Sequence, residues 1–139
     1  MEPKAKTIIE RHGFTDPDRK KPKHDEIQIW VYKNIDTIIK TIYPQYDLTN
    51  RSTQPTLEFP VMDNRYVVGF VDVYCKDLYL GIEVKTEIPV LGDLIRQIQF
   101  YRQYAGGSWI VVSPDDRFAP VLKDSNIHFF KYKNPGELF

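Results

Sequence analysis

The segment GFVDVYCKDLYLGIEVK, residues 69–85, contains two apolar runs of the kind found in buried strands, separated by a short polar dipeptide. Three charged residues interrupt these runs: Asp72 in the first, and Glu83 and Lys85 in the second. A charge inside a buried strand costs free energy unless a partner compensates it. The segment therefore predicts a β-hairpin whose charges need an explanation.

The dipeptide Lys76-Asp77 is the expected two-residue turn of this hairpin. With that turn, Asp72 lies opposite Gly81. Side chains alternate along a strand, and directly opposed residues share a face. Asp72 therefore projects from the same side of the sheet as Glu83 and Lys85. Any even number of loop residues preserves this arrangement, whereas an odd number would turn Asp72 away from Glu83.

The other face of the hairpin is entirely apolar. It carries Val71, Val73, Cys75, Leu78, Leu80, Ile82 and Val84. We expect this face to pack into the core and the charged face to be a separate surface. Glu83 is diagonal to Asp72 at roughly 7–8 Å between backbones, so their carboxylates can share one cation.

Two carboxylates and a lysine on one face predict a site that hydrolyses phosphodiesters. Oxygen ligands favour Mg²⁺ or Mn²⁺ over Zn²⁺. The metal would polarise a phosphate and lower the pKa of a bound water, and Lys85 would neutralise the developing charge. The alternative interpretation is a structural protein with a salt-bridge cluster on a solvated sheet face. The all-apolar opposite face favours the metal site.

The pattern along the chain predicts one α/β domain, residues 1–139, with a mixed central sheet of four to five strands flanked by helices. Helical spacing of apolar residues predicts a helix from His24 to about Tyr43 and another from Val90 or Leu91 to Tyr104. Strands are expected at TLEFPVM (56–62), RYVVGFVDVY (65–74), LYLGIEVK (78–85), SWIVVS (108–113) and NIHFFKYK (126–133). The order is one helix, three strands, one helix and two strands.

Residues 1–23 precede the core, which spans 24–132, and residues 133–139 form a tail. The first part is expected to contain a short helix over 4–12 and then a polar loop. This loop carries the densest basic cluster, namely Arg19, Lys20, Lys21 and Lys23. We take Lys20 and Lys21 as candidate contacts to nucleic-acid phosphates, with a solvated loop as an equally good interpretation.

Composition restricts the classes of function. Lys plus Arg equals Asp plus Glu, at 19 each, so nucleic-acid binding would depend on local patches or on a surface gained by dimerisation. The single cysteine, Cys75, argues against a disulfide scaffold and against a zinc cluster. No apolar run approaches the ~20 residues that span a bilayer, so we expect an intracellular protein with no membrane partner.

Asp72 is followed by ten residues and then by Glu83-Val84-Lys85. This spacing resembles the D-x(n)-(D/E)-x-K signature of the PD-(D/E)xK nuclease superfamily. On the second expected helix, Gln97 and Tyr101 are similar to the Q-x-x-x-Y motif of its RecB-like branch. The preceding strands look like those of RecB-like and Holliday-junction-resolvase-like members. One departure is that a valine, and not a proline, precedes Asp72.

This resemblance implies a restriction-endonuclease-like core and an Mg²⁺-dependent deoxyribonuclease, with Mn²⁺ able to substitute. Asp72, Glu83 and the carbonyl of Val84 would bind the metal, and Lys85 would assist the attacking water. Gln97 and Tyr101, which match the Q-x-x-x-Y motif, would lie near the metal and the DNA backbone. The type of DNA substrate and the choice between endonuclease and exonuclease stay open.

Many members of the superfamily carry an acidic residue on the first helix, facing the metal. Glu26 is the best candidate for this catalytic position, with Asp25, His24 and Glu58 as alternatives. The implied partners are DNA, a second copy of the chain, and a separate helicase or recombination protein. The expected location of the protein is the cytoplasm. If a virus or plasmid encodes it, this would be the cytoplasm of the host cell.

A non-catalytic nucleic-acid-binding or assembly module on the same fold is the main alternative function. Such proteins usually lose one of the three charged residues, whereas Asp72, Glu83 and Lys85 are all present in this chain. Their presence favours a nuclease.

Overall fold

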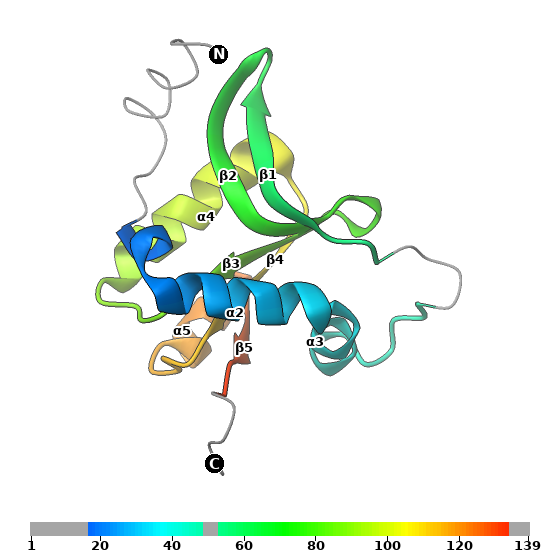
Figure 1. The fold of residues 1–139 in the computed structure, drawn as a ribbon, viewed down its shortest axis with the longest axis vertical. Coiled ribbons are helices and arrows are strands. Elements are labelled where there is room, and N and C mark those ends of the chain that lie inside the picture. Colours follow the sequence, from blue (N-terminus) through cyan, green and yellow to red (C-terminus); the bar gives the residue numbers. More distant parts are fainter. Residues whose placement is uncertain (1–16, 49–52, 134–139) are drawn as a thin grey trace.

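A five-stranded mixed sheet forms the centre of this α/β protein (Figure 1). The computed structural model describes residues 17–48 and 53–133, so the expected helix over 4–12 and the tail beyond residue 133 lie outside the described residues. The strands are β1 (Thr56–Asp63), β2 (Tyr66–Cys75), β3 (Leu80–Val84), β4 (Ser108–Ser113) and β5 (His128–Lys131), in that spatial order. β1 pairs with β2 and β2 pairs with β3 in antiparallel fashion, whereas β3, β4 and β5 run parallel to one another.

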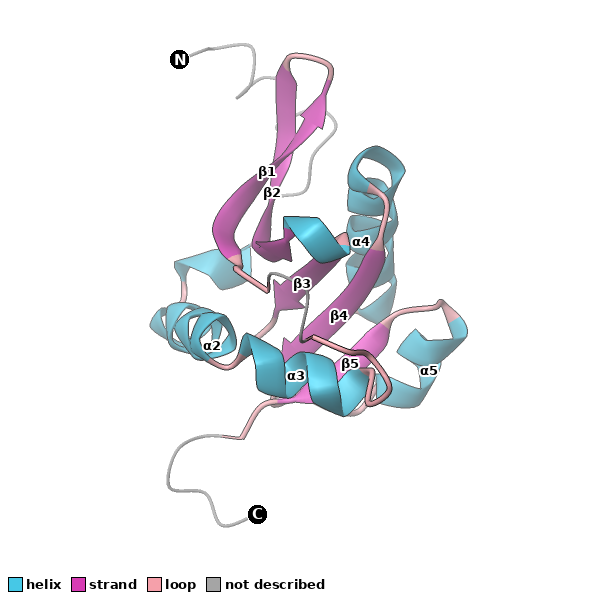
Figure 2. Ribbon diagram, turned by 90° about the vertical axis from the view of Figure 1, so that its right-hand side faces the viewer, coloured by secondary structure: helices cyan, strands magenta, loops and turns pink. Residues whose placement is uncertain are grey.

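Helices cover both faces of the sheet. On one face lie α2 (Pro22–Lys33) and α3 (Ile35–Ile42), and on the other lie α4 (Leu91–Ala105) and α5 (Ala119–Asp124) (Figure 2). Two short 3-10 helices, η1 (Pro17–Lys20) and η2 (Lys76–Leu78), complete the described elements. The predicted order of the five strands and of the helix between the third and fourth strands is confirmed, whereas two helices stand where one was expected before β1, and α5 is an addition. Among the described residues, none of these helices combines the length and apolar character needed to cross a membrane.

The sheet separates two hydrophobic cores. The core under α2 and α3 includes Ile27, Val31, Ile38, Ile39, Val73, Cys75, Leu80, Ile82, Val84, Ile110 and Val112. The core under α4 and α5 includes Val61, Val68, Val71, Leu94, Ile98, Tyr101, Trp109, Val111 and Leu122. The predicted apolar hairpin face is thus confirmed except for Val71. β2 pairs with β3 only over Val73–Cys75, and its earlier part curves away with β1, which carries Val71 to the second core (Figure 1).

The first predicted helix is wrong in one respect, because two helices replace it. α2 ends at Lys33 and α3 begins at Ile35, with Asn34 between them at φ −119° and ψ 27°. The Asn34 amide donates a hydrogen bond to the Trp30 carbonyl at 2.8 Å, which competes with regular helical bonding. The interruption lets α2 contact β2, β3 and β4 while α3 contacts β5.

The hairpin loop is longer than predicted. Cys75 pairs with Leu80 and Tyr74 pairs with Gly81, so the loop contains four residues, 76–79, and not two. Tyr79 closes the loop in the left-handed region, at φ 50°. Because four is also an even number, the predicted sharing of faces is preserved while each opposite partner shifts by two residues.

Gly81 is where this register can be tested by mutation. A Cβ atom at Gly81 would lie 2.5 Å from Cζ3 of Trp109, so the indole fills the space beside this glycine. We expect Gly81→Ala to lower the free energy of unfolding by about 1–3 kcal/mol, the usual cost of overpacking a core. Urea denaturation measures this change.

Gly92 in α4 provides the matched control. A Cβ atom there meets only the mobile end of Arg96, at 3.3 Å. In a helix, Gly→Ala at a compatible site stabilises by about 0.4–1 kcal/mol. Equal effects of the two substitutions would contradict the packing of Gly81 against Trp109.

Candidate functional site

Asp72 and Glu83 lie side by side where β2 separates from β3. Both are fully buried, at 0% exposure. Val73 pairs with Ile82, so the next residues, Asp72 and Glu83, face each other directly and not diagonally. The Asp72 N–H donates to Oε1 of Glu83 at 3.3 Å, and the Val84 N–H donates to Oδ2 of Asp72 at 2.8 Å. Each carboxylate is therefore held by the main chain of the opposite strand.

Arg19, at the end of the chain's first described turn, extends into this pair of carboxylates. Its Nη2 lies 2.9 Å from Oδ1 of Asp72 and donates to the Phe70 carbonyl at 2.5 Å, while Nη1 pairs with Glu58. Burial alone would lower the pKa of Arg19, but the charges of Asp72, Glu83 and Glu58 raise it above its usual value. Arg19 therefore stays protonated and neutralises part of the buried negative charge.

Helix α2 supplies two more polar groups from one side. His24 is 1% exposed, and its Nε2 lies 3.3 Å from Oδ1 of Asp72. One turn later, Gln28 donates to the Asp72 carbonyl at 2.9 Å and to Oε2 of Glu58 at 2.6 Å. Residues four apart share a helical face, so His24 and Gln28 approach the strand together. Glu58, from β1, thereby joins the same polar network.

Glu26 is not part of this group, which corrects the sequence expectation. It is exposed, pairs with Lys23 at 2.9 Å and accepts a hydrogen bond from the Tyr132 hydroxyl at 3.4 Å. The hydrogen bond and charge of Lys23 lower the pKa of Glu26. A residue two positions from His24 is turned by roughly 200° around the helix, so Glu26 points away from Asp72. Asp25 is also exposed, 3.5 Å from Nδ1 of His24.

Helix α4 covers the charged face, so this surface is separate from the core under α2 and α3 but is itself buried. Lys85, just after β3, is buried at 9% exposure and shares the strand face of Glu83 by alternation. Gln97 and Tyr101 are buried above this face, and Gln97 donates to the Tyr101 hydroxyl at 3.5 Å. Burial and the charge of Glu83 raise the pKa of Tyr101, which keeps the phenol neutral. A Cβ at Gly69 would lie 2.5 Å from Cε1 of Tyr101, so this glycine admits the ring.

The candidate phosphate contact Lys21 is exposed at the edge of the site. Its Nζ lies 3.4 Å from Oδ1 of Asp18 and 3.4 Å from the hydroxyl of Thr86. The Asp18 carboxylate accepts both the Thr86 N–H, at 2.7 Å, and the Thr86 hydroxyl, at 2.5 Å. The η1 segment is thus attached beside Lys85. The side chain of Lys20 lies outside the described part of the chain.

The oxygen atoms of this site suit a hard divalent cation that keeps some of its water. Among the described residues, no three His, Cys, Asp or Glu side chains form a complete metal cage. Mg²⁺ usually binds one or two carboxylates and retains several waters, so two carboxylates are enough. Within the described structure, the buried Oδ1 of Asp72 accepts no hydrogen bond of good geometry, although Arg19 and His24 lie within ionic contact. This oxygen is the best-placed ligand.

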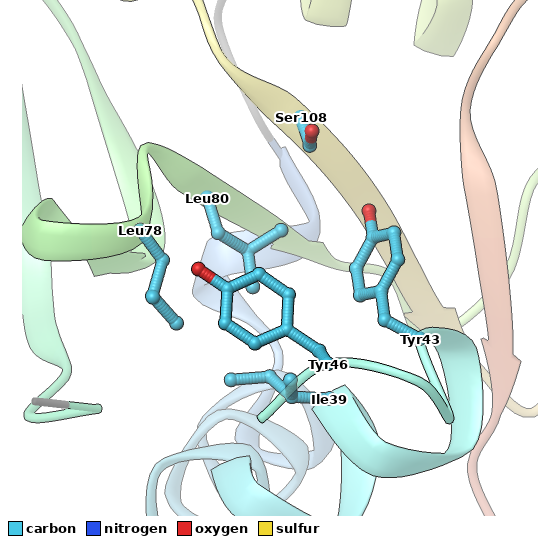
Figure 3. A pocket seen from close by; sticks show the side chains of 6 residues that line it. All are labelled: Ile39, Tyr43, Tyr46, Leu78, Leu80 and Ser108. Carbon is cyan, nitrogen blue, oxygen red and sulfur yellow. The ribbon is translucent and has the colours of Figure 1, made fainter. Parts of the chain in front are cut away.

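A small pocket lies elsewhere, on the α2–α3 side of the sheet. Its volume is about 80 Å³, and it is lined by Ile39, Tyr43, Tyr46, Leu78, Leu80 and Ser108 (Figure 3). Typical ligand pockets measure about 300–1,000 Å³. The pocket contains none of the predicted site residues, and its size makes it a poor candidate for a substrate site.

No family profile, curated protein or solved structure matches this chain.

Arg19 and Gln28 were not expected at the site. Gln28 had a detectable signal, because it follows His24 by four residues on a predicted helix. Arg19 had none, because a loop residue has no periodic pattern that would indicate its partner.

Proposed function

We propose that this protein is a metal-dependent DNA nuclease of the PD-(D/E)xK type, with a restriction-endonuclease-like core. The observation that carries the proposal is the pair of fully buried, adjacent carboxylates of Asp72 and Glu83 beside the buried Lys85. Two like charges buried together need shared cations to offset their desolvation and repulsion. A divalent ion at this place would meet that need and perform phosphodiester chemistry.

In this proposal, Asp72, Glu83 and the carbonyl of Val84 hold Mg²⁺ or Mn²⁺. When bound, the ion supplies polarisation of the phosphate and a water of lowered pKa. The Lys85 ammonium positions the attacking water and neutralises charge on the transferred phosphate. The main-chain bonds from Asp72 to Glu83 and from Val84 to Asp72 fix both carboxylates before substrate arrives. His24, 3.3 Å from Oδ1 of Asp72, orients that carboxylate.

The contacts to DNA would come from the exposed edge of the site. Lys21 is exposed near Thr86 and is suited to a phosphate, and Lys20 is adjacent in the sequence. Gln97 and Tyr101 are buried, so we assign them to positioning the Glu83 side of the site from α4. A net charge of zero fits a protein that enlarges its DNA surface by forming a homodimer. A helicase or recombination protein could act with it as a separate chain.

A non-catalytic DNA-binding or assembly module is the second candidate, and one observation favours it. The guanidinium of Arg19 already contacts Asp72, one of the carboxylates that a metal would use, and also pairs with Glu58. A permanent Arg19 pair would make a metal unnecessary. The structural alternative of a solvated, salt-bridged sheet face is not supported, because Asp72 and Glu83 are fully buried.

Metal removal tests the proposed function. We expect the protein to cleave DNA with Mg²⁺ or Mn²⁺ and to lose cleavage when EDTA is in excess. One gel with linear duplex, single-stranded and four-way-junction DNA measures both the activity and the preferred substrate. Cleavage that survives EDTA would contradict a metal-dependent mechanism. DNA binding without cleavage under any divalent ion would establish the non-catalytic alternative.

A further inference from the structure

Arg19 occupies the position beside Asp72 where a metal ion would bind. Its Nη2 is 2.9 Å from Oδ1 of Asp72, the oxygen best placed to bind a cation. The guanidinium also experiences the charge of Glu83, so it compensates both carboxylates of the pair. A divalent ion and a guanidinium at the same oxygen repel each other. The two cations therefore compete for one place.

The segment that carries Arg19 is anchored on both sides of the site. Asp18 binds the N–H and hydroxyl of Thr86, one residue beyond Lys85. On the other side, Arg19 donates to the carbonyl of Phe70. This double attachment holds the guanidinium over the carboxylates.

Glu58 gives Arg19 a second partner when Asp72 is taken by a metal. Its carboxylate pairs with Nη1 of Arg19, and its side chain is half exposed, at 50%. Gln28 holds the other oxygen of Glu58 at 2.6 Å. The guanidinium can thus leave Oδ1 of Asp72 and keep its pair with Glu58 at the entrance of the site.

We propose that Arg19 is a built-in competitor of the metal ion. In the metal-free protein it neutralises Asp72, and metal binds only when its guanidinium moves away, so the segment around Arg19 sets the metal affinity of the site. This inference rests on the proposed nuclease function, since it assumes the metal site at Asp72 and Glu83. It also separates that function from the non-catalytic module, in which the Arg19 pair would be permanent.

Calorimetric titration of the full chain with Mn²⁺ tests this competition. We expect Arg19→Met to bind Mn²⁺ about tenfold or more tightly than wild type, because the metal no longer displaces a buried ion pair. Arg65→Met is the matched control, since it removes the same charge from the exposed turn between β1 and β2. It should bind Mn²⁺ as wild type does. Adding Asp72→Asn to Arg19→Met should abolish binding.

A second variant covers the case in which Arg19→Met does not fold, as judged by circular dichroism. Arg19→Gln keeps a donor for Phe70 or Glu58 without the charge, and it should show the same tighter binding. Unchanged or weaker Mn²⁺ affinity in the folded variant would overturn the competition while wild-type binding still supported the proposed metal site. Binding that survives Asp72→Asn would place the ion elsewhere and overturn the inference. No binding in any variant would overturn both the inference and the nuclease proposal.

Discussion

Replacing Asp72 with asparagine is expected to lower the rate of DNA cleavage by about 10³-fold or more. The substitution removes the charge and keeps the shape, because an amide oxygen can still accept the Val84 N–H that now bonds Oδ2 at 2.8 Å. The remaining Glu83 alone would hold a divalent ion poorly. Glu83→Gln is expected to cause a similar loss. The cleavage rate at saturating Mg²⁺ measures the loss of activity. A titration with Mn²⁺ measures the loss of metal binding.

Removing one partner of a buried ion pair can also destabilise the fold, typically by about 3–5 kcal/mol. The folding of Asp72→Asn must therefore be checked by circular dichroism and a thermal melt. The cleavage assay is then run below the melting temperature of the variant. Asp77→Asn is a matched control, because it neutralises an exposed carboxylate in the loop of the same hairpin. This control should cleave as wild type does. Cleavage by folded Asp72→Asn at more than a tenth of the wild-type rate would contradict the proposed role.

Glu26→Gln separates the sequence expectation from the structure. Glu26 lies on the outer side of α2, paired with Lys23, and we expect its substitution to leave cleavage nearly unchanged. His24 instead faces Asp72, because Ile27 and Val31 fix which side of α2 is buried. That orientation was present in the sequence, since the apolar spacing places His24, and not Glu26, on the isoleucine side of the helix. The family resemblance favours the acidic residue at this position, whereas helical geometry favours the histidine.

The hairpin shows which part of a site can be predicted from local rules. The shared face of Asp72 and Glu83 depends only on the loop having an even number of residues, so it survived an error of two residues in the loop. The opposite partner of Asp72 depends on the loop length itself. A loop of this length requires Tyr79 to adopt the left-handed backbone conformation. Tyrosine has no preference for that conformation, so the sequence contains no signal for the register.

Contacts between distant segments were beyond these rules. Arg19 reaches Asp72 because Asp18 binds Thr86 and the η1 turn is thereby drawn over the end of β3. Neither contact follows from periodicity or turn chemistry, since both join residues that are far apart in the sequence through the tertiary fold. The basic cluster was visible in the sequence, but its charge compensates buried carboxylates at one position, Arg19, and remains exposed at another, Lys21.

Cys75 is expected to react with iodoacetamide at least about 10³-fold more slowly in the native protein than in the unfolded chain. The side chain is 1% exposed in the core under α2 and α3. Burial, and to a smaller extent the charge of Asp36, raises the pKa of its thiol from 9.0 to about 12. Only the thiolate reacts, so at pH 8 this change lowers the reactive fraction by about 10³, before steric protection is counted.

This measurement tests the geometry of the site without any assay of function. Cys75 is three residues from Asp72 on the same strand, an odd number, so the two side chains point to opposite faces. Labelling in denaturant gives the intrinsic rate, and Tyr79→Cys in a Cys75→Ala background gives the rate of a native exposed thiol, since Tyr79 is 66% exposed. Fast labelling of native Cys75 would contradict its burial in the core under α2 and α3. It would also contradict the placement of Asp72 on the opposite face of β2, beside Glu83, on which the proposed metal chemistry depends.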